Sequence, residues 1–319
     1  MKSKSVIPKT FIYILSSISI ATIIFMFIFV FYKSWPVLSA SGLSLLTTGG
    51  FDAQIQAAFT STSDSQMLHF GFLGLIYGTL MTTFFSLIIA TVIGIGAAIT
   101  ICEYTSPKVS DMFVSIVRVL ASVPSVVFGL VGIVTVVPFF QKLFVNHFEL
   151  FTVWNFAGWD GRNMLSAIIV LTFMIVPTVV SLSVDALRAV PDSRRETGYA
   201  FGMKKFRVIR RILLPSARSG IIAGVVLAAG RGIGEAIAVS MVCGGLGILP
   251  TPSLGFVNFL APTLPLASAI INKSEAMGSV GVDSALFVCG ALLLTIGALL
   301  SIGARLINKQ MRKADGFDD

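Results

Sequence analysis

Charged residues are scarce in this sequence, at 12% of its 319 residues, whereas ordinary soluble domains carry about 25%. The apolar fraction is 55%, and the mean hydropathy is +0.92. A soluble domain of this length could not cover its surface with so few charges. The composition therefore argues against a soluble enzyme and predicts a protein embedded in a lipid bilayer.

Cysteine and histidine are rare too, and none of them forms a recognisable site. Cys102, Cys243 and Cys289 lie in or beside apolar runs without metal-ligand spacing, so we interpret them as small packing residues. His69 and His147 are isolated and flank predicted loops. We expect no metal site and no catalytic site in this chain.

Nucleotide-binding motifs are also missing. No Gly-x-x-x-x-Gly-Lys-Ser/Thr stretch occurs, so the chain cannot cradle nucleotide phosphates as a P-loop does. The alternating glycines Gly230, Gly232 and Gly234 lie within an apolar run and are not a nucleotide fingerprint. Because no acid–base pair or nucleophile constellation is present either, we predict that the chain is not an enzyme.

Long uncharged runs are what the sequence has instead. A helix needs about 20 apolar residues to cross a bilayer, and residues 10–32, 70–102, 163–184 and 284–304 meet that length. The first run is longer than the apolar core of a signal peptide, which is about 7–15 residues, so we interpret it as a retained span. We predict six spanning helices, at residues 11–32, 71–102, 112–139, 164–187, 219–243 and 282–306.

Prolines and glycines interrupt the apolar sequence in two regions. Pro124 and Pro138 predict a kink in the third span. Residues 244–272 are apolar but rich in proline and glycine, and such backbone cannot face lipid. We expect residues 244–272 to form a short helix and loops packed at one face of the membrane.

The positive charges set the orientation of these spans. Of the 23 lysines and arginines, 17 fall on the side of the amino terminus, four on the opposite side, and two, Arg118 and Arg231, within predicted spans. Positive residues stay on the cytoplasmic side, so both termini and residues 189–218 are predicted to be cytoplasmic. The net charge of +8 reflects this topology and does not indicate nucleic-acid binding.

The richest segment is the loop at residues 189–218, between the fourth and fifth spans. Pro191 suits a helix start, with Asp192 or Ser193 as its cap, and Gly202 suits a turn before a second short helix. An apolar stripe of Ile209, Ile212 and Leu213 follows, surrounded by lysines and arginines. This pattern fits either an amphipathic helix at the membrane surface or an element that docks on a partner.

The spacing within this loop resembles a motif of ABC importer permeases: Glu-Ala-Ala, three residues, Gly, nine residues, Ile-x-Leu-Pro. In that family the loop inserts into a cleft of the ATP-hydrolysing subunit. The sequence departs from the motif at Thr197 and Gly198, and a glycine within a helix costs about 1 kcal/mol, so we expect a looser helix there. The resemblance implies these ATPase-docking residues: Glu196, Thr197, Gly198, Gly202, Ile212, Leu214 and Pro215.

Further motifs extend the resemblance over most of residues 70–307. Residues 120–129 (LASVPSVVFG) and 230–239 (GRGIGEAIAV) resemble the third-span and fifth-span motifs of phosphate (Pst) importer permeases, and residues 75–79 (LIYGT) open the second span as in that type. The long first external loop and residues 264–270 (LPLASAI) are more similar to the PstC member than to the PstA member.

This resemblance implies an all-α integral membrane protein of MetI-like permease architecture in a bacterial cytoplasmic (inner) membrane. Residues 1–70 would form the first span and an external loop, 71–307 the permease core, and 308–319 a polar cytoplasmic tail. The implied partners are a PstA-like permease, a dimeric PstB-like ATPase and an external phosphate-binding protein. The chain itself would hold no cofactor, because ATP and Mg²⁺ would bind to the ATPase.

Two charges lie deep within the predicted fifth span. Arg231 and Glu235 are four residues apart and would share one helix face. A charge at mid-bilayer costs at least about 2.5 kcal/mol on insertion scales, so each needs compensation. The pair is either a structural ion pair that fixes helix packing or part of a path on which Arg231 meets a passing anion.

Two other functions stay open. One is a permease of the same class for another solute, such as molybdate, sulfate or an amino acid. The other is a secondary transporter or channel, which is expected to show inverted-repeat halves with matching broken helices. The sequence has no convincing internal repeat, and this favours the importer.

Overall fold

The computed structural model describes residues 6–60, 68–145, 161–250 and 252–314, and these ranges are helical apart from short connections and one isolated bridge between Gly244 and Thr263. Six helices are long and apolar enough to cross a membrane, which confirms the predicted number of spans. They are Phe11–Leu46, Leu73–Tyr104, Ser125–Leu143, Met164–Arg188, Lys205–Ile233 and Val280–Ile307.

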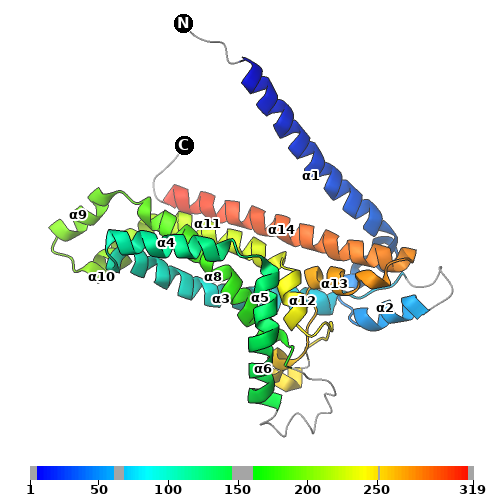
Figure 1. Ribbon diagram of the computed structural model, residues 1–319. Coiled ribbons are helices and arrows are strands. Elements are labelled where there is room, and N and C mark those ends of the chain that lie inside the picture. The colour runs from blue at the N-terminus through cyan, green and yellow to red at the C-terminus, as the bar shows by residue number, and fades with distance from the viewer. Residues whose placement is uncertain (1–5, 61–67, 146–160, 251, 315–319) are drawn as a thin grey trace.

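Thirteen α-helices can be followed in the described ranges (Figure 1). They are α1 (Val6–Ser41), α2 (Phe51–Thr60), α3 (Leu73–Ile99), α4 (Pro107–Ala121), α5 (Ser125–Val131), α6 (Val137–Phe140), α8 (Met164–Arg188), α9 (Asp192–Ala200), α10 (Lys205–Val208), α11 (Leu214–Ile233), α12 (Ile237–Val242), α13 (Leu266–Asn272) and α14 (Val280–Ala314). Four π-helical turns join or extend them, at Thr100–Tyr104, Gly132–Val136, Gln141–Val145 and Ile209–Leu213.

Helix α8 is the centre of the bundle and packs against α3, α4 and α11. Two thirds of its most apolar window is buried, against none for the first span. Without a hydrophobic driving force in lipid, close helix contacts depend on small residues. Gly94 of α3 lies against Val179, and Gly224 of α11 lies against Leu182, so closely that a Cβ at either glycine would come within 2.8 Å of the facing side chain.

Helix α1 lies at the edge of the molecule. Its second half packs on α14, where the rings of Phe29 and Phe287 meet edge to face at 5.7 Å. Its first half diverges from the other helices (Figure 1). The apolar side chains of that half are exposed within this chain, as expected for a helix that faces lipid or another subunit.

We predicted a single kinked helix at residues 112–139 for the third span, and this was wrong. The chain leaves the helix at Ser122 and Val123 and starts again after Pro124, whose ψ of 138° is extended. A proline disfavours helical backbone at the residue before it, and this ends α4. Helix α4 lies along α8, whereas α5 and α6 point away from the bundle (Figure 1). At Pro138, in contrast, the helical run continues through α6.

The fifth predicted span is also interrupted. Helix α11 ends at Ile233 and α12 begins at Ile237, so Arg231 and Glu235 do not share a continuous helix face as we expected. The three nearby glycines weaken the helix. The carboxylate Oε1 of Glu235 accepts a hydrogen bond from the Ala238 N–H at 3.0 Å, which caps the new helix.

Residues 244–272 form irregular backbone, a 3₁₀ segment (Pro252–Leu260) and α13 at the end of the molecule opposite α9 (Figure 1). The segment packs on protein: Leu264 and Leu266 are fully buried, and the Leu266 N–H donates to the Thr79 hydroxyl at 2.9 Å. Asp52 of α2 holds it further, by accepting from the Gly247 N–H and by an ion pair of 2.7 Å with Lys273. The predicted short helix with loops is thus present.

Candidate functional site

The 189–218 loop consists of the short helix α9, a tight turn and the first part of the helical run Lys205–Ile233, so the predicted second short helix is continuous with the fifth span. Helix α9 follows Pro191, and the turn after it has Gly202 at φ +69°. The Gly202 N–H donates to the Tyr199 carbonyl at 2.9 Å, and the Met203 N–H donates to the Gly198 carbonyl at 3.2 Å. This paired pattern is the Schellman motif, which favours glycine at the left-handed position. The turn predicted at Gly202 is therefore confirmed.

Gly198 is a contact point between the two halves of the loop. A Cβ there would lie 2.7 Å from Ile212 Cδ1 and 3.1 Å from Val208 Cγ2. The glycine lets α9 approach the following helical segment, and α9 is a regular helix around it. The looser helix expected at Gly198 stays a prediction, and the close packing of Gly198 opposes it.

The loop turns its aliphatic stripe inward and its aromatic side chains outward. Ile209 and Leu213 are buried against α3 and α8, so the stripe is not the exposed surface. Phe201 is 78% exposed and Phe206 is 66% exposed. Among the motif residues Glu196, Thr197, Gly202 and Pro215 are exposed, Ile212 and Leu214 are half-buried, and Gly198 is buried.

A hollow of about 720 Å³ lies beside this surface, between the end of α8, α9 and the start of α11. Its lining includes Arg194, Arg211, Ile212 and Pro215. Arg194 donates to the Ser216 hydroxyl at 2.7 Å, which holds one guanidinium at the rim. The hollow combines apolar side chains with two arginines, and arginine is a residue type enriched at protein interfaces.

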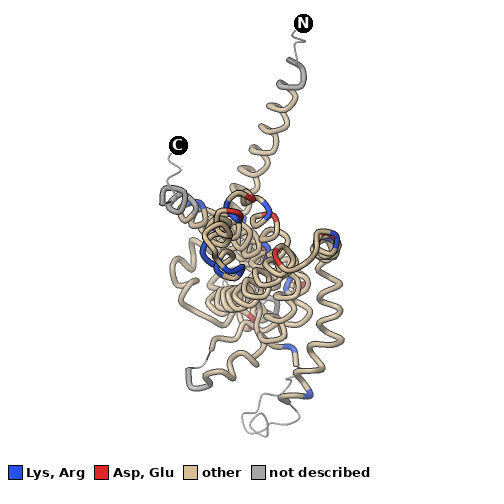
Figure 2. Tube along the Cα trace, turned by 90° about the vertical axis from the view of Figure 1, so that its left-hand side faces the viewer, with Lys and Arg blue, Asp and Glu red and all other residues tan. Residues whose placement is uncertain are grey.

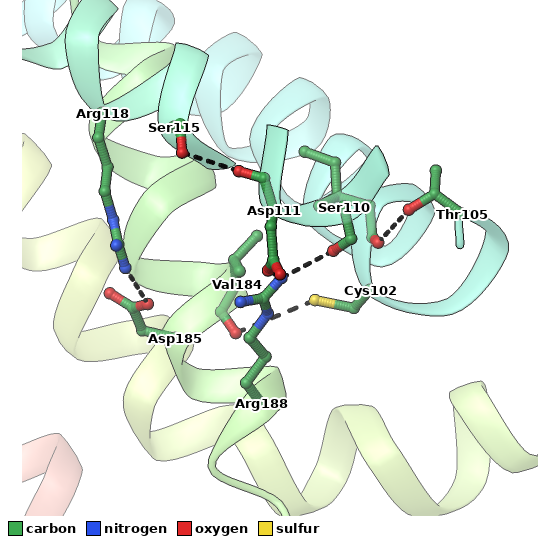
Figure 3. A network of polar contacts seen from close by, with 10 residues as sticks. Cys102, Thr105, Ser110, Asp111, Ser115, Arg118, Val184, Asp185 and Arg188 are labelled. Atoms are coloured by element: carbon green, nitrogen blue, oxygen red, sulfur yellow. Dashed lines mark hydrogen bonds and ion pairs between the residues drawn. The ribbon is translucent and has the colours of Figure 1, made fainter. Parts of the chain in front are cut away.

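Charged residues of both signs gather at this end of the bundle, which faces the viewer in Figure 2. Arg118 of α4 pairs with Asp185 of α8 at 3.0 Å, and Arg188 pairs with Asp111 at 2.9 Å (Figure 3). Asp185 and Arg188 are three residues apart on α8, yet each pairs with α4, because the helix break before α5 leaves α4 lying along α8.

The Glu103 carboxylate is largely withdrawn from water, although it lies at the end of a span. Its side chain is only 8% exposed, and it forms an ion pair of 3.1 Å with Arg195 of α9. The nearby Lys205 of α10 donates to the Glu103 carbonyl oxygen and lies over the Tyr104 ring. The π turn that ends α3 thus holds both helices of the 189–218 loop.

Arg231 is compensated by neutral groups rather than by Glu235. Its Nη1 donates to the Thr178 hydroxyl at 3.1 Å and to the Ala121 carbonyl at 3.3 Å. Ala121 is the last residue of α4, and the break after it frees this carbonyl from the helix. The negative end of a helix dipole favours a cation. Within the described residues, no ion pair joins Arg231 to a carboxylate, so the guanidinium keeps its net charge.

The third-span motif (residues 120–129) and the fifth-span motif (residues 230–239) lie against each other. Besides the Arg231–Ala121 contact, Gly129 of α5 faces α12 so closely that a Cβ would lie 2.6 Å from Met241 Sδ. An open cleft of about 910 Å³ between α1, α8, α11 and α14 reaches Arg231 and Thr178. Its other walls are mainly apolar, so an anion in this region would meet few competing polar groups.

Comparison with known families now places the chain. The family model described as "Binding-protein-dependent transport system inner membrane component" matches residues 90–313. The chain belongs to this family. It is therefore a multi-pass membrane permease component, as the motifs in its third and fifth spans indicated.

Individual relatives indicate which type of permease the chain resembles. The phosphate transport system permease protein PstC of Mesorhizobium japonicum is 32% identical over 283 residues, which are 86% of this chain and 81% of the relative. PstC 1 of Mycobacterium tuberculosis is 34% identical over 248 residues, which are 74% of this chain and 72% of the relative. The expected resemblance to the PstC type is confirmed.

Solved structures confirm the fold. A chain of the inward-facing MetNI methionine ABC transporter aligns with a TM-score of 0.55 at 18% identity, over 74% of this chain and 94% of its own. A chain of a bacterial ABC transporter for alginate import aligns with a TM-score of 0.55 at 16% identity, over 93% and 96%. At these identities the likeness concerns the MetI-like architecture alone.

Sequence reasoning missed the acceptors of Arg231 and the partner of Arg195. Thr178 is 53 residues from Arg231 and follows Pro177 in an apolar run, where a threonine carries no distinctive signal. Glu103 is 92 residues before Arg195 at the end of another span. Only the packing of α8 against α3 and α11 brings these groups together.

Proposed function

We propose that this chain is the transmembrane permease subunit of an ATP-driven phosphate importer and forms half of its translocation path. The observation that carries this proposal is the identity to PstC permeases over most of the chain. Membership of the family implies assembly with ATPase and further permease subunits. We assign these roles to a PstA-like permease, a dimeric PstB-like ATPase that binds ATP and Mg²⁺, and an external phosphate-binding protein.

In this proposal the 189–218 loop docks on the ATPase. The exposed aromatic side chains Phe201 and Phe206 and the hollow lined by Arg194 and Arg211 support docking. Large aromatics and arginines are the residue types that dominate buried protein interfaces. The tight turn at Gly202 presents Phe201 at the tip of the loop, so the turn is the part most sensitive to change.

Arg231 is proposed to serve phosphate passage. Within the described residues only its Nη1 is hydrogen-bonded, which leaves Nε and Nη2 for an anion. A guanidinium matches two phosphate oxygens in a fork geometry. Glu235 lies in the break between α11 and α12 and caps α12. Its proposed role is to limit how tightly an anion is held, because a path must release what it binds.

Reconstitution tests this function. The complex of this chain with the proposed partners, purified and placed in proteoliposomes, should import radiolabelled phosphate only when ATP and the binding protein are supplied. Sulfate and molybdate should be imported far more slowly. ATP-driven uptake of sulfate or molybdate instead of phosphate would assign another solute, and uptake without ATP would assign a secondary transporter.

A further inference from the structure

Helix α3, with the π turn that ends it, contacts residues 244–272, the segment around Arg231 and the 189–218 loop. At one end Gly74 lies against the backbone of Gly247, and Thr79 accepts the Leu266 N–H. In its middle the Thr83 methyl group lies beside Gly232, next to Arg231. At the other end it continues into the π turn Thr100–Tyr104, which contacts the 189–218 loop. A rigid helix with these contacts can carry a displacement from one end to the other.

The contact between this π turn and the loop is concentrated in Arg195. Its guanidinium reaches Glu103 at 3.1 Å, Asp192 at 2.5 Å and the Leu187 carbonyl at 3.4 Å. It therefore joins the end of α3, the end of α8 and the first turn of α9. The Glu103 and Arg195 side chains are 8% and 22% exposed, so water screens this pair little.

The geometry of the pair suits a contact that must survive movement. Glu103 Oε1 and Arg195 Nε are buried without an aligned hydrogen bond, so the attraction between the side chains is mainly electrostatic. Coulomb attraction falls slowly with distance, whereas a hydrogen bond weakens steeply with angle. The pair can thus stay closed while the side chains reorient, so a displacement of the loop pulls α3 with it. Lys205 adds a second attachment on the same turn.

We infer that Glu103, acting through Arg195, is a positioning residue that transmits displacement of the 189–218 loop to α3 and so couples ATP hydrolysis to transport. This inference rests on the proposed function, because it takes the loop as the site where the ATPase docks. The other ion pairs at this end differ: Arg118–Asp185 and Arg188–Asp111 join α4 to α8 and have side chains 40–71% exposed. Exposed pairs contribute little energy, and neither contacts the loop.

The readout is phosphate imported per ATP hydrolysed by the reconstituted complex. Glu103→Gln keeps the shape of the side chain and removes its charge. We expect co-purification of the ATPase at the wild-type ratio, continued ATP hydrolysis, and an import-to-hydrolysis ratio lower by about tenfold. The matched control Asp111→Asn removes a carboxylate of an exposed pair at the same end and should change the ratio by less than about twofold.

A double variant, Glu103→Gln with Arg195→Gln, leaves no unpaired buried charge and gives the decisive measurement if the single variant does not accumulate. It should assemble and show the same lowered ratio. An unchanged ratio in the assembled double variant overturns the inference, as does loss of ATPase binding in both variants, which would make Glu103 a support for the fold of the loop. Failure of the proposed function is a separate result: the wild-type complex would then show no ATP-driven import.

Discussion

Arg195 and Arg231 both carry a charge that is partly withdrawn from water, but different groups compensate them. Arg195 is surrounded by the carboxylates of Glu103 and Asp192, whereas Arg231 is held by the Ala121 carbonyl and the Thr178 hydroxyl. Carboxylates neutralise the charge of an arginine, so Arg195 has little attraction left for a further anion. Neutral acceptors only orient the guanidinium, so Arg231 remains available to an anion. We therefore propose that compensation by dipoles rather than by charge leaves Arg231 able to bind a passing anion.

Arg231→Gln should have the largest effect on transport of the variants that test this difference between the two arginines. It should lower phosphate uptake by roughly 100-fold, because a hydrogen-bonded charge contributes about 3 kcal/mol, while the complex assembles normally. Uptake in proteoliposomes and the subunit ratio after purification measure both effects. Arg118→Gln, which removes an exposed arginine paired with Asp185, is the control and should transport normally.

The double variant Arg231→Gln with Glu235→Gln separates the pathway role from a structural ion pair. Because the two side chains are not paired within the described structure and Glu235 caps α12, the second change should not restore uptake. Full uptake by the double variant at wild-type protein levels would contradict the pathway role of Arg231.

Gly202→Asp should have the next largest effect, at the end where Arg195 lies. Gly202 adopts φ +69° with open space around the position of a Cβ, so the fold tolerates the new side chain at the expense of backbone strain. An added carboxylate beside Phe201 should weaken ATPase docking, and we expect uptake to fall by about tenfold or more. Co-purification of the ATPase measures docking. Normal assembly and transport by this variant would show that the turn does not dock.

Thr178→Val tests how Arg231 is oriented. The substitution keeps the shape of the side chain and removes one of the two acceptors of Nη1. A lost hydrogen bond to a charged group of this kind should raise the phosphate concentration for half-maximal uptake roughly fivefold, with little change in the maximal rate. Thr178→Ser retains the hydroxyl and should behave as the wild type. Equal behaviour of the two variants would mean that Thr178 does not position Arg231.

The sequence was sufficient for the number of spans because bilayer thickness imposes long apolar runs that local composition reveals. It was sufficient for the Gly202 turn for a similar reason, since one residue needs a left-handed backbone. It failed where the outcome depended on tertiary contacts. The break at Pro124 redirects α4 along α8, and only this brings Ala121 to Arg231 and Asp185 to Arg118. The roles of Arg231 and of the loop residues stay predictions.

Gly198→Ala is the smallest expected effect, and it tests the packing of the docking loop itself. It would restore one of the two alanines of the permease motif and raise the helix propensity by about 1 kcal/mol. The new methyl group would, however, lie 2.7 Å from Ile212 Cδ1, and overpacking costs about 1–3 kcal/mol. We expect a net loss of about 1 kcal/mol in the free energy of unfolding, seen as a slightly lower melting temperature of the purified complex.

Ile212→Val removes the Cδ1 atom that the methyl group added by Gly198→Ala would meet, and it is therefore the matched partner of that change. On its own it leaves a small void and should be mildly destabilising, by about 1 kcal/mol. Combined with Gly198→Ala, the methyl group added at one position fills the space vacated at the other, so the two losses should cancel rather than add. A double variant less stable than either single one would show that Gly198 and Ile212 are not in direct contact. The close approach of α9 to the segment that follows it would then have another cause.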